Sequence, residues 1–187
     1  LHGVFDTGTF ELHKKQIDAA SELGAGVVVI HQDNSVSGDR KHLDAELRRD
    51  VVAYANERGI RIALENGELS FLADAIEKVD GLGICLDVGH VYFTQDPMSK
   101  YLEVLKRRII HLHIQDILPE DEYAAPHVLK DHYIPGTGRI PDADWILLTE
   151  VLREVNFQGI AVFEIQPRNP FQTAFLGKAF MEKLLKA

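Results

Sequence analysis

Acidic side chains and histidines stand at the ends of five short apolar runs in this chain. They are His31, Glu65, Asp87, His113 and Glu164. Carboxylate and imidazole groups bind divalent cations and transfer protons, so a fold that gathered them in one place would form a reactive centre. We therefore expect an active site where these runs end.

The apolar runs are predicted strands, and helical segments separate them. Runs such as Val27–Ile30 are continuous and β-branched, which is typical of strands buried on both faces of a parallel sheet. Between the strands, apolar residues recur at helical spacing. The predicted strands are Leu1–Phe5, Val27–Ile30, Ile60–Leu64, Leu82–Leu86, Arg107–Ile114 and Ile160–Phe163. The predicted helices are Phe10–Leu23, a helix from Asp39 or Arg40 to Arg58, a helix that Ser70 caps and that runs to about Lys78, a helix that starts at Asp96 and Pro97 and runs to about Lys106, Asp144–Val155 and Phe171–Leu185.

This alternation predicts an α/β fold, a (β/α) TIM-type barrel. Parallel strands linked through helices place their carboxyl ends at one edge, where such barrels build their active sites. The chain has 187 residues, whereas a closed barrel has eight strands and typically about 250 residues. We therefore expect one domain over residues 1–187 that lacks the first two strands of the usual eight, either through N-terminal truncation or because the chain is naturally short.

Composition restricts the partners and the compartment. The formal net charge is −9, and the single cysteine, Cys85, falls within a predicted strand. One cysteine allows no internal disulfide, which favours a reducing, cytoplasmic location. The sequence shows no apolar stretch of membrane-spanning length and no signal peptide, so we expect no membrane partner. The negative balance argues weakly against a nucleic-acid partner.

Three of the polar residues at strand ends are carboxylates. Gathering Glu65, Asp87 and Glu164 at one buried place would be costly without a counter-charge. A divalent cation supplies that charge, and three carboxylates with one imidazole form a mixed oxygen and nitrogen ligand set. Such a set favours one Mn²⁺ ion, with Zn²⁺, Co²⁺ and Mg²⁺ as alternatives. His111 and His113 face the same way on one strand, and we expect His111 one layer deeper, in the core.

Five segments carry these polar residues in order: Ala63–Asn66, Leu86–His90, His111–Asp116, His132–Ile140 and Val162–Ile165. Together they resemble the xylose isomerase-like barrel superfamily, which comprises sugar and sugar phosphate isomerases and epimerases together with endonuclease IV. The resemblance covers essentially the whole chain. It is specific for the superfamily because five segments occur in order, but no single segment is specific for one substrate.

The resemblance implies roles for individual residues. The implied metal ligands are Glu65, Asp87, His113 and Glu164, and the implied substrate-binding residues are His90, His132, His31 and His2. Glu65 and Glu164 would also be catalytic, because one carboxylate on each side of the substrate can remove a proton next to a carbonyl and return it, through a metal-stabilised enediolate. The implied activity is metal-dependent isomerisation or epimerisation of a small-molecule sugar or sugar phosphate.

Three alternatives stay open. The first is a related lyase or dehydratase that acts on a polyol or keto-sugar. The second is an endonuclease IV-like zinc phosphodiesterase acting on abasic DNA, but that branch has an Asp ligand two residues before His132, where this chain has Lys130; Asp131 could replace it only through a shift of register. The third is a chain without catalysis of its own, either an inactive remnant or a homo-oligomer that completes its barrel with a second copy.

Overall fold

The computed structural model describes residues 9–31, 45–118, 131–166 and 170–186. Within these ranges it contains α-helices, parallel strands and one short 3-10 helix, η1, at His90–Phe93. The α-helices are α1 (Phe10–Glu22), α2 (Ala45–Asn56), α3 (Leu69–Lys78), α4 (Met98–Leu105), α5 (Asp142–Glu154) and α6 (Pro170–Lys186). The strands are β1 (Val27–Ile30), β2 (Arg61–Glu65), β3 (Gly83–Asp87), β4 (Ile109–Ile114) and β5 (Ile160–Phe163).

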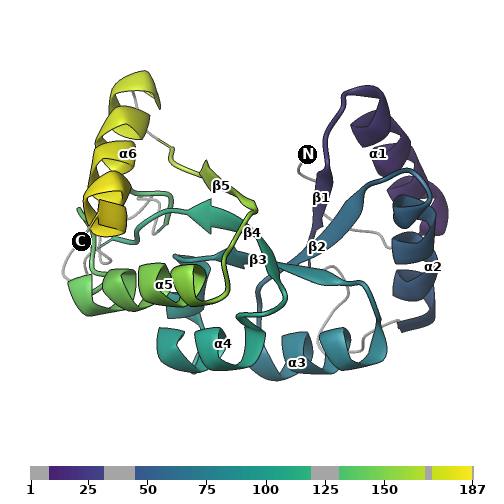
Figure 1. The fold of residues 1–187 in the computed structure, drawn as a ribbon, viewed down its shortest axis with the longest axis horizontal. Coiled ribbons are helices and arrows are strands. Elements are labelled where there is room, and N and C mark those ends of the chain that lie inside the picture. The colour runs from purple at the N-terminus through teal and green to yellow at the C-terminus, as the bar shows by residue number, and fades with distance from the viewer. Residues whose placement is uncertain (1–8, 32–44, 119–130, 167–169, 187) are drawn as a thin grey trace, which may run out of the picture. The chain divides into compact units, whose positions relative to one another are not determined.

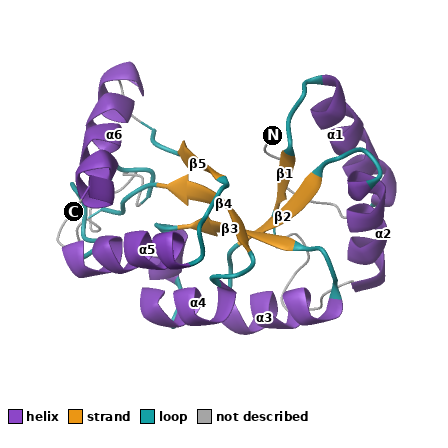
Figure 2. Cartoon of the chain, in the orientation of Figure 1, coloured by secondary structure: helices purple, strands orange, loops and turns teal. Residues whose placement is uncertain are grey.

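The strands form one sheet in which the spatial order follows the order along the chain, β1-β2-β3-β4-β5 (Figures 1 and 2). β1 and β2 are parallel, with Ile30 opposite Leu64, and β2 and β3 are parallel, with Glu65 opposite Cys85. At least one helix separates each strand from the next, because parallel neighbours need a crossover that returns the chain to the same edge. The predicted α/β fold, with strands and helices in alternation, is therefore confirmed.

The chain divides into two compact units. The first unit comprises Leu1–Leu86 and Arg108–His111, and the second comprises Asp87–Arg107 and Leu112–Ala187. The expectation of one domain over residues 1–187 stays a prediction.

One buried cluster of the first unit is formed by residues of its strands. Val27 and Val29 of β1, Ala63 of β2 and Cys85 of β3 form a buried cluster, and the partly buried Ile110 packs against it. All four residues of β1 are buried, which explains why this strand reads as a continuous apolar run instead of an alternating one.

The core of the second unit is formed by the inner faces of α4 and α5. Tyr101 and Leu102 of α4 and Trp145 and Leu148 of α5 are at most 1% exposed. β5 is less covered than the other strands, and Ile160 is 61% exposed. The helical spacing that predicted these two helices thus corresponds to real buried faces.

Several predicted boundaries differ in the structure by a few residues. α4, for example, begins at Met98 instead of Asp96, and its N-cap is Pro97, without a side-chain hydrogen bond. Ser70 was expected to cap a helix, but it lies inside α3, whose N-cap is Glu68 without a side-chain hydrogen bond. α5 begins at Asp142, two residues before the predicted start, because Pro141 supplies the extended N-cap. The predicted first strand, Leu1–Phe5, lies outside the described residues.

Within the described ranges, the helices all lack the combination of length and apolar character that crossing a membrane requires.

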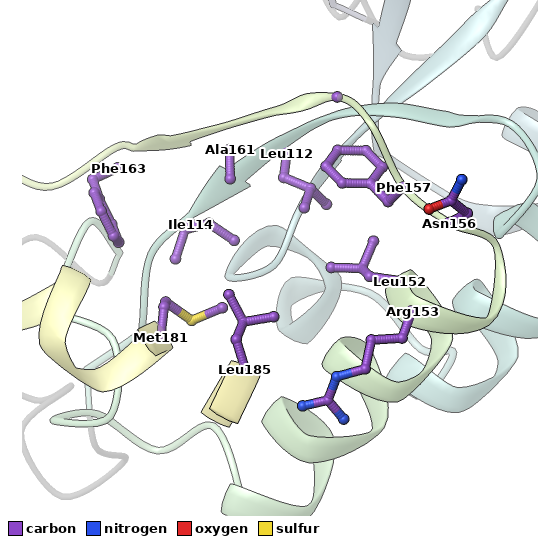
Figure 3. A pocket seen from close by; sticks show the side chains of 11 residues that line it. Leu112, Ile114, Leu152, Arg153, Asn156, Phe157, Ala161, Phe163, Met181 and Leu185 are labelled. Carbon is purple, nitrogen blue, oxygen red and sulfur yellow. The ribbon is translucent and has the colours of Figure 1, made fainter. Parts of the chain in front are cut away.

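An apolar cavity of about 500 Å³ lies in the second unit, between β4, β5 and the helices α5 and α6 (Figure 3). Leu112 and Ile114 of β4 and Ala161 and Phe163 of β5 are among the residues that line it. The two β4 residues flank His113 in the sequence, so their side chains face the opposite side of the sheet. The cavity therefore lies between the sheet and the helices, on the side of β4 opposite His113, and is separate from the predicted active-site residues.

Candidate metal centre

The predicted ligands stand at the carboxyl ends of the strands. Glu65 is the last residue of β2, Asp87 is the last residue of β3, His113 is next to last in β4, and Glu164 directly follows β5. Glu65, Asp87 and His113 are 2%, 0% and 3% exposed. Buried ionisable groups of this kind require a partner charge or hydrogen bonds, which makes their surroundings informative.

In the first unit, His31 and Glu65 form a close pair. His31 follows β1 directly, and the parallel register that sets Ile30 beside Leu64 brings the next residue of each strand side by side. Nε2 of His31 lies 3.0 Å from Oε2 of Glu65. A predicted pocket histidine and a predicted catalytic carboxylate are thus neighbours.

In the second unit, Asp87, His113 and Glu164 converge. Nδ1 of His113 lies 2.9 Å from Oε2 of Glu164 and 3.8 Å from Oδ2 of Asp87. One ligand atom from each of the three lies within 4.8 Å of the others. Two carboxylates and an imidazole at these separations fit a single divalent cation, because the ion would offset the cost of bringing two acidic groups into a buried place.

His90 and His132 lie next to this group. His90, at the start of η1, donates its backbone N–H to Oδ1 of Asp87 at 2.9 Å. Its Nε2 lies 3.4 Å from Oδ2 of Asp131, whose Oδ1 lies 2.8 Å from Nδ1 of His132. Nε2 of His132 lies 4.0 Å from Oε1 of Glu164. Both histidines are partly exposed, as groups that meet a substrate must be.

Gln115 connects Asp87 with the backbone of His132. Sequence reasoning missed this residue. It is 0% exposed. Its Nε2 donates to Oδ2 of Asp87 at 2.7 Å, and its Oε1 accepts the backbone N–H of His132 at 2.5 Å. An uncharged amide gives no motif of its own. The one available signal was that a polar residue directly follows β4, whose carboxyl end was predicted to contribute to the active site.

Sequence reasoning considered Asp131 only as a replacement for a ligand of the nuclease branch. The sequence places it beside His132 but out of register with the nuclease pattern, and the structure puts its carboxylate between His90 and His132. Ligand atoms of these three residues lie within 4.8 Å of one another. The backbone of His132 has a positive φ of 64°, which turns the chain and cannot be read from residue spacing.

Asp116 holds the segment that follows His132. Its Oδ1 accepts the N–H groups of Ile117 and Ile140, at 2.8 and 3.1 Å, and its Oδ2 accepts those of Gly136 and Gly138, at 3.0 and 2.9 Å. Burial raises the pKa of this carboxyl, and the four N–H donors act in the opposite direction. A side chain at position 138 would meet the carbonyl oxygen of Ile117, since a Cβ there would lie 2.1 Å from it.

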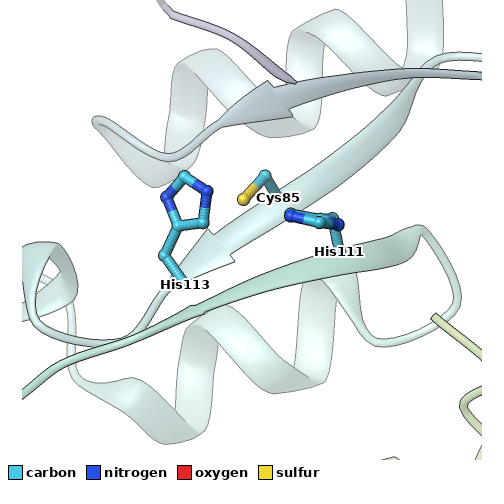
Figure 4. Close-up of side chains that lie close together, drawn as sticks. All are labelled: Cys85, His111 and His113. Carbon is cyan, nitrogen blue, oxygen red and sulfur yellow. The ribbon is translucent and has the colours of Figure 1, made fainter. Parts of the chain in front are cut away.

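His111 is buried, as predicted for a core position. It is 7% exposed and lies close to Cys85 in the first unit (Figure 4). Each of the two residues precedes a predicted ligand by two positions on its strand, Cys85 before Asp87 and His111 before His113. His2 and Lys130 lie outside the described residues, so the substrate-binding role of His2 stays a prediction.

The family model described as xylose isomerase-like TIM barrel matches residues 8–184 of this chain. An uncharacterised protein of Sinorhizobium fredii is 30% identical over an alignment of 171 positions, and the alignment covers 82% of this chain and 51% of that protein. An inosose dehydratase of Glaesserella parasuis is 24% identical, over 75% of this chain and 54% of its own. A D-psicose 3-epimerase of Enterocloster bolteae is 26% identical, over 71% of this chain and 42% of its own. The chain thus spans about half the length of the curated relatives it matches.

Solved structures agree on the fold. A D-tagatose 3-epimerase-like protein superposes with a TM-score of 0.78 at 22% identity, covering 99% of this chain and 76% of the other. The IOLI protein with a bound zinc atom superposes with a TM-score of 0.71 at 17% identity, covering 92% of this chain and 67% of the other. The β/α units described above are therefore part of a TIM barrel, and the chain belongs to the xylose isomerase-like TIM barrel family.

Proposed function

We propose that this chain provides the catalytic part of a metal-dependent isomerase or epimerase that acts on a sugar or sugar phosphate. The observation that carries the proposal is the convergence of Asp87, His113 and Glu164 in the second unit. A relative named as an epimerase and similarity to a solved epimerase-like protein support the substrate class.

Glu65 is the fourth proposed ligand. It stands opposite Cys85 in the parallel register of β2 and β3, and Asp87 follows Cys85 by two residues on the same strand. The resemblance of these segments to the family implies Glu65 as a ligand, and a cation would offset the cost of burying its carboxylate. His31, which lies 3.0 Å from Glu65, would then border the substrate.

The proposed ligand set suits Mn²⁺, because hard carboxylate oxygens outnumber the single imidazole nitrogen. Zn²⁺ is the main competitor, since the IOLI protein binds a zinc atom. When bound, the ion would polarise the carbonyl of the substrate and offset the negative charge that develops beside it.

Proton transfer falls to Glu65 and Glu164 in this proposal. Each carboxylate removes or returns a proton on its side of the carbon next to the carbonyl. His113, 2.9 Å from Oε2 of Glu164, fixes the orientation of that carboxylate. His90 and His132 donate hydrogen bonds to hydroxyl or phosphate oxygens, and Asp131 orients both rings through contacts of 3.4 and 2.8 Å.

Dehydration is the second candidate activity, because one relative is named as an inosose dehydratase. The first step would be the same, with a carboxylate removing the proton next to the carbonyl. The reactions differ afterwards, since a dehydratase expels a neighbouring hydroxyl as water instead of returning the proton.

Metal content per chain tests the ligand set. Wild-type protein purified without added metal and then incubated with Mn²⁺ should hold one ion per chain, and Glu164→Gln should lose it. Glu103→Gln is the matched control, because Glu103 is exposed on α4. Failure of the wild type to bind any ion would overturn the proposal. Two or three tightly held zinc ions would favour the phosphodiesterase alternative instead.

Exchange with solvent deuterium tests the reaction. The metal-loaded wild type, incubated with D-psicose or D-tagatose in D₂O, should incorporate deuterium at the carbon next to the carbonyl, as seen by NMR. Glu164→Gln should abolish the incorporation, and Glu103→Gln should retain it. Loss of water from an inosose without return of the proton would identify the dehydratase.

A further inference from the structure

Gln115 occupies an unusual place in the second unit. Its side chain is fully buried and bonds in two directions, to Oδ2 of Asp87 at 2.7 Å and to the backbone N–H of His132 at 2.5 Å. Gly89, two residues after Asp87 in the chain, leaves space for this amide, because a Cβ at position 89 would lie 2.9 Å from three atoms of the Gln115 side chain. The backbone and the glutamine thus fit together closely.

The backbone of His132 needs external support. Its φ of 64° lies in the left-handed region, which residues other than glycine seldom adopt unless neighbouring structure holds them there. Gln115 supplies one bond to its N–H, and Gln166 donates its N–H to the carbonyl oxygen of His132 at 3.0 Å. The next residue, Tyr133, exchanges two backbone bonds with Asp116, at 2.9 and 3.0 Å.

We propose that Gln115 is a positioning residue that couples the Asp87 carboxylate to the His132 segment. The amide orients Asp87 as a ligand and, through its other end, holds the His132 backbone where its imidazole can meet a substrate. Metal affinity and substrate placement would then depend on one uncharged side chain. This inference rests on the proposed function for its metal, but the hydrogen-bonded link itself is a property of the metal-free protein.

The alternative is that Gln115 merely satisfies buried polar groups. The two roles differ in what a substitution changes. Loss of a side chain that only satisfies buried polar groups lowers the stability of the fold and leaves the metal affinity unchanged. Loss of a group that orients a metal ligand typically weakens metal affinity by about 10- to 100-fold.

Gln115→Met is the test variant, because methionine keeps the length of the side chain and removes both hydrogen bonds. Gln16→Met is its matched control, since Gln16 is a buried glutamine of α1 outside the proposed site. Co²⁺ binding, followed by its visible absorption without substrate, should be about tenfold weaker in Gln115→Met, with an altered spectrum. Gln16→Met should match the wild type.

Hydrogen exchange in the metal-free protein tests the link independently. The amides of residues 131–140 should exchange faster in Gln115→Met and also in Asp87→Ala, which removes the other partner of the amide. Gln16→Met should leave them unchanged. Unaltered exchange in Gln115→Met, or Co²⁺ affinity and spectrum equal to those of Gln16→Met, would overturn the inference. Wild-type protein that binds no Co²⁺ would overturn the proposed function, and the exchange data would still decide the link.

Discussion

At the scale of single residues, hydrogen bonds from neutral groups hold the charged ones in place. Asp87 accepts hydrogen bonds from the side-chain amide of Gln115 and from the backbone N–H of His90. Asp116 accepts hydrogen bonds from four backbone N–H groups. Bonds to a charged acceptor are stronger than neutral ones, so each carboxylate fixes the backbone that surrounds it. His132, whose left-handed backbone costs about 1–3 kcal/mol in isolation, lies between these two anchored points.

Replacing Asp116 with Asn should destabilise the protein. Both carboxylate oxygens accept two N–H groups each, so whichever position the new NH₂ takes, it faces two donors. Leaving buried donors unsatisfied costs about 1–3 kcal/mol per group, and we expect a loss at the upper end of this range. Urea unfolding measures it. Asp80→Asn, at an exposed turn, is the control and should change the free energy of unfolding by less than about 0.5 kcal/mol.

The pH dependence of the same pair of proteins tests the ionisation of Asp116. Burial raises the pKa of this carboxyl, so the folded chain binds the proton more tightly than the unfolded chain does. The stability gained from that proton is fully present below the unfolded-state pKa and is lost as pH rises through the folded-state pKa. The difference in unfolding free energy between wild type and Asp116→Asn should therefore grow as pH falls through this window. A difference that shrinks instead would mean that the four N–H donors outweigh burial.

At the scale of elements, much of the fold was predictable from periodicity. The described strands lie where apolar runs occur, since strands buried on both faces, such as β1, favour apolar residues, and the helices follow their apolar stripes. Residues that depend on local backbone geometry were not predictable. Ser70 has the chemistry of a cap but lies inside α3, and Gln115 acquires its role from residues 28 positions before and 17 after it.

Helix α5 gives a direct test of the buried stripe. Leu148 faces the core and is 0% exposed, whereas Ile146, two residues earlier on the same helix, is 46% exposed. Leu148→Ala should lower the free energy of unfolding by about 2–5 kcal/mol, because it removes buried methyl groups and leaves a cavity. Ile146→Ala, with a similar change in size, should cost well under half as much. Equal losses in urea unfolding would show that the helix packs through a different face.

At the scale of the whole molecule, the proposed ligands come from positions as far apart as 65 and 164, at the carboxyl ends of separate strands. An unfolded chain does not hold such a set together, so an ion that binds it should bind the native protein alone. The net charge of −9 also favours a bound cation, because the ion reduces the repulsion among acidic groups. The idea that a second copy completes the barrel stays a prediction. Whether the proposed ligands bind a cation can be measured independently of it.

Metal binding should therefore appear as thermal and chemical stabilisation. Mn²⁺ at about one hundred times its dissociation constant should raise the free energy of unfolding by about 2.7 kcal/mol, and a chelator should reverse the gain. Glu164→Gln should respond weakly or not at all at the same Mn²⁺ concentration, while Glu103→Gln should respond like the wild type. An equal response in Glu164→Gln would place the ion elsewhere, since Glu164 contacts His113 at the centre of the proposed set. Comparing these three proteins by calorimetry separates a specific site from the general attraction of an acidic surface for cations.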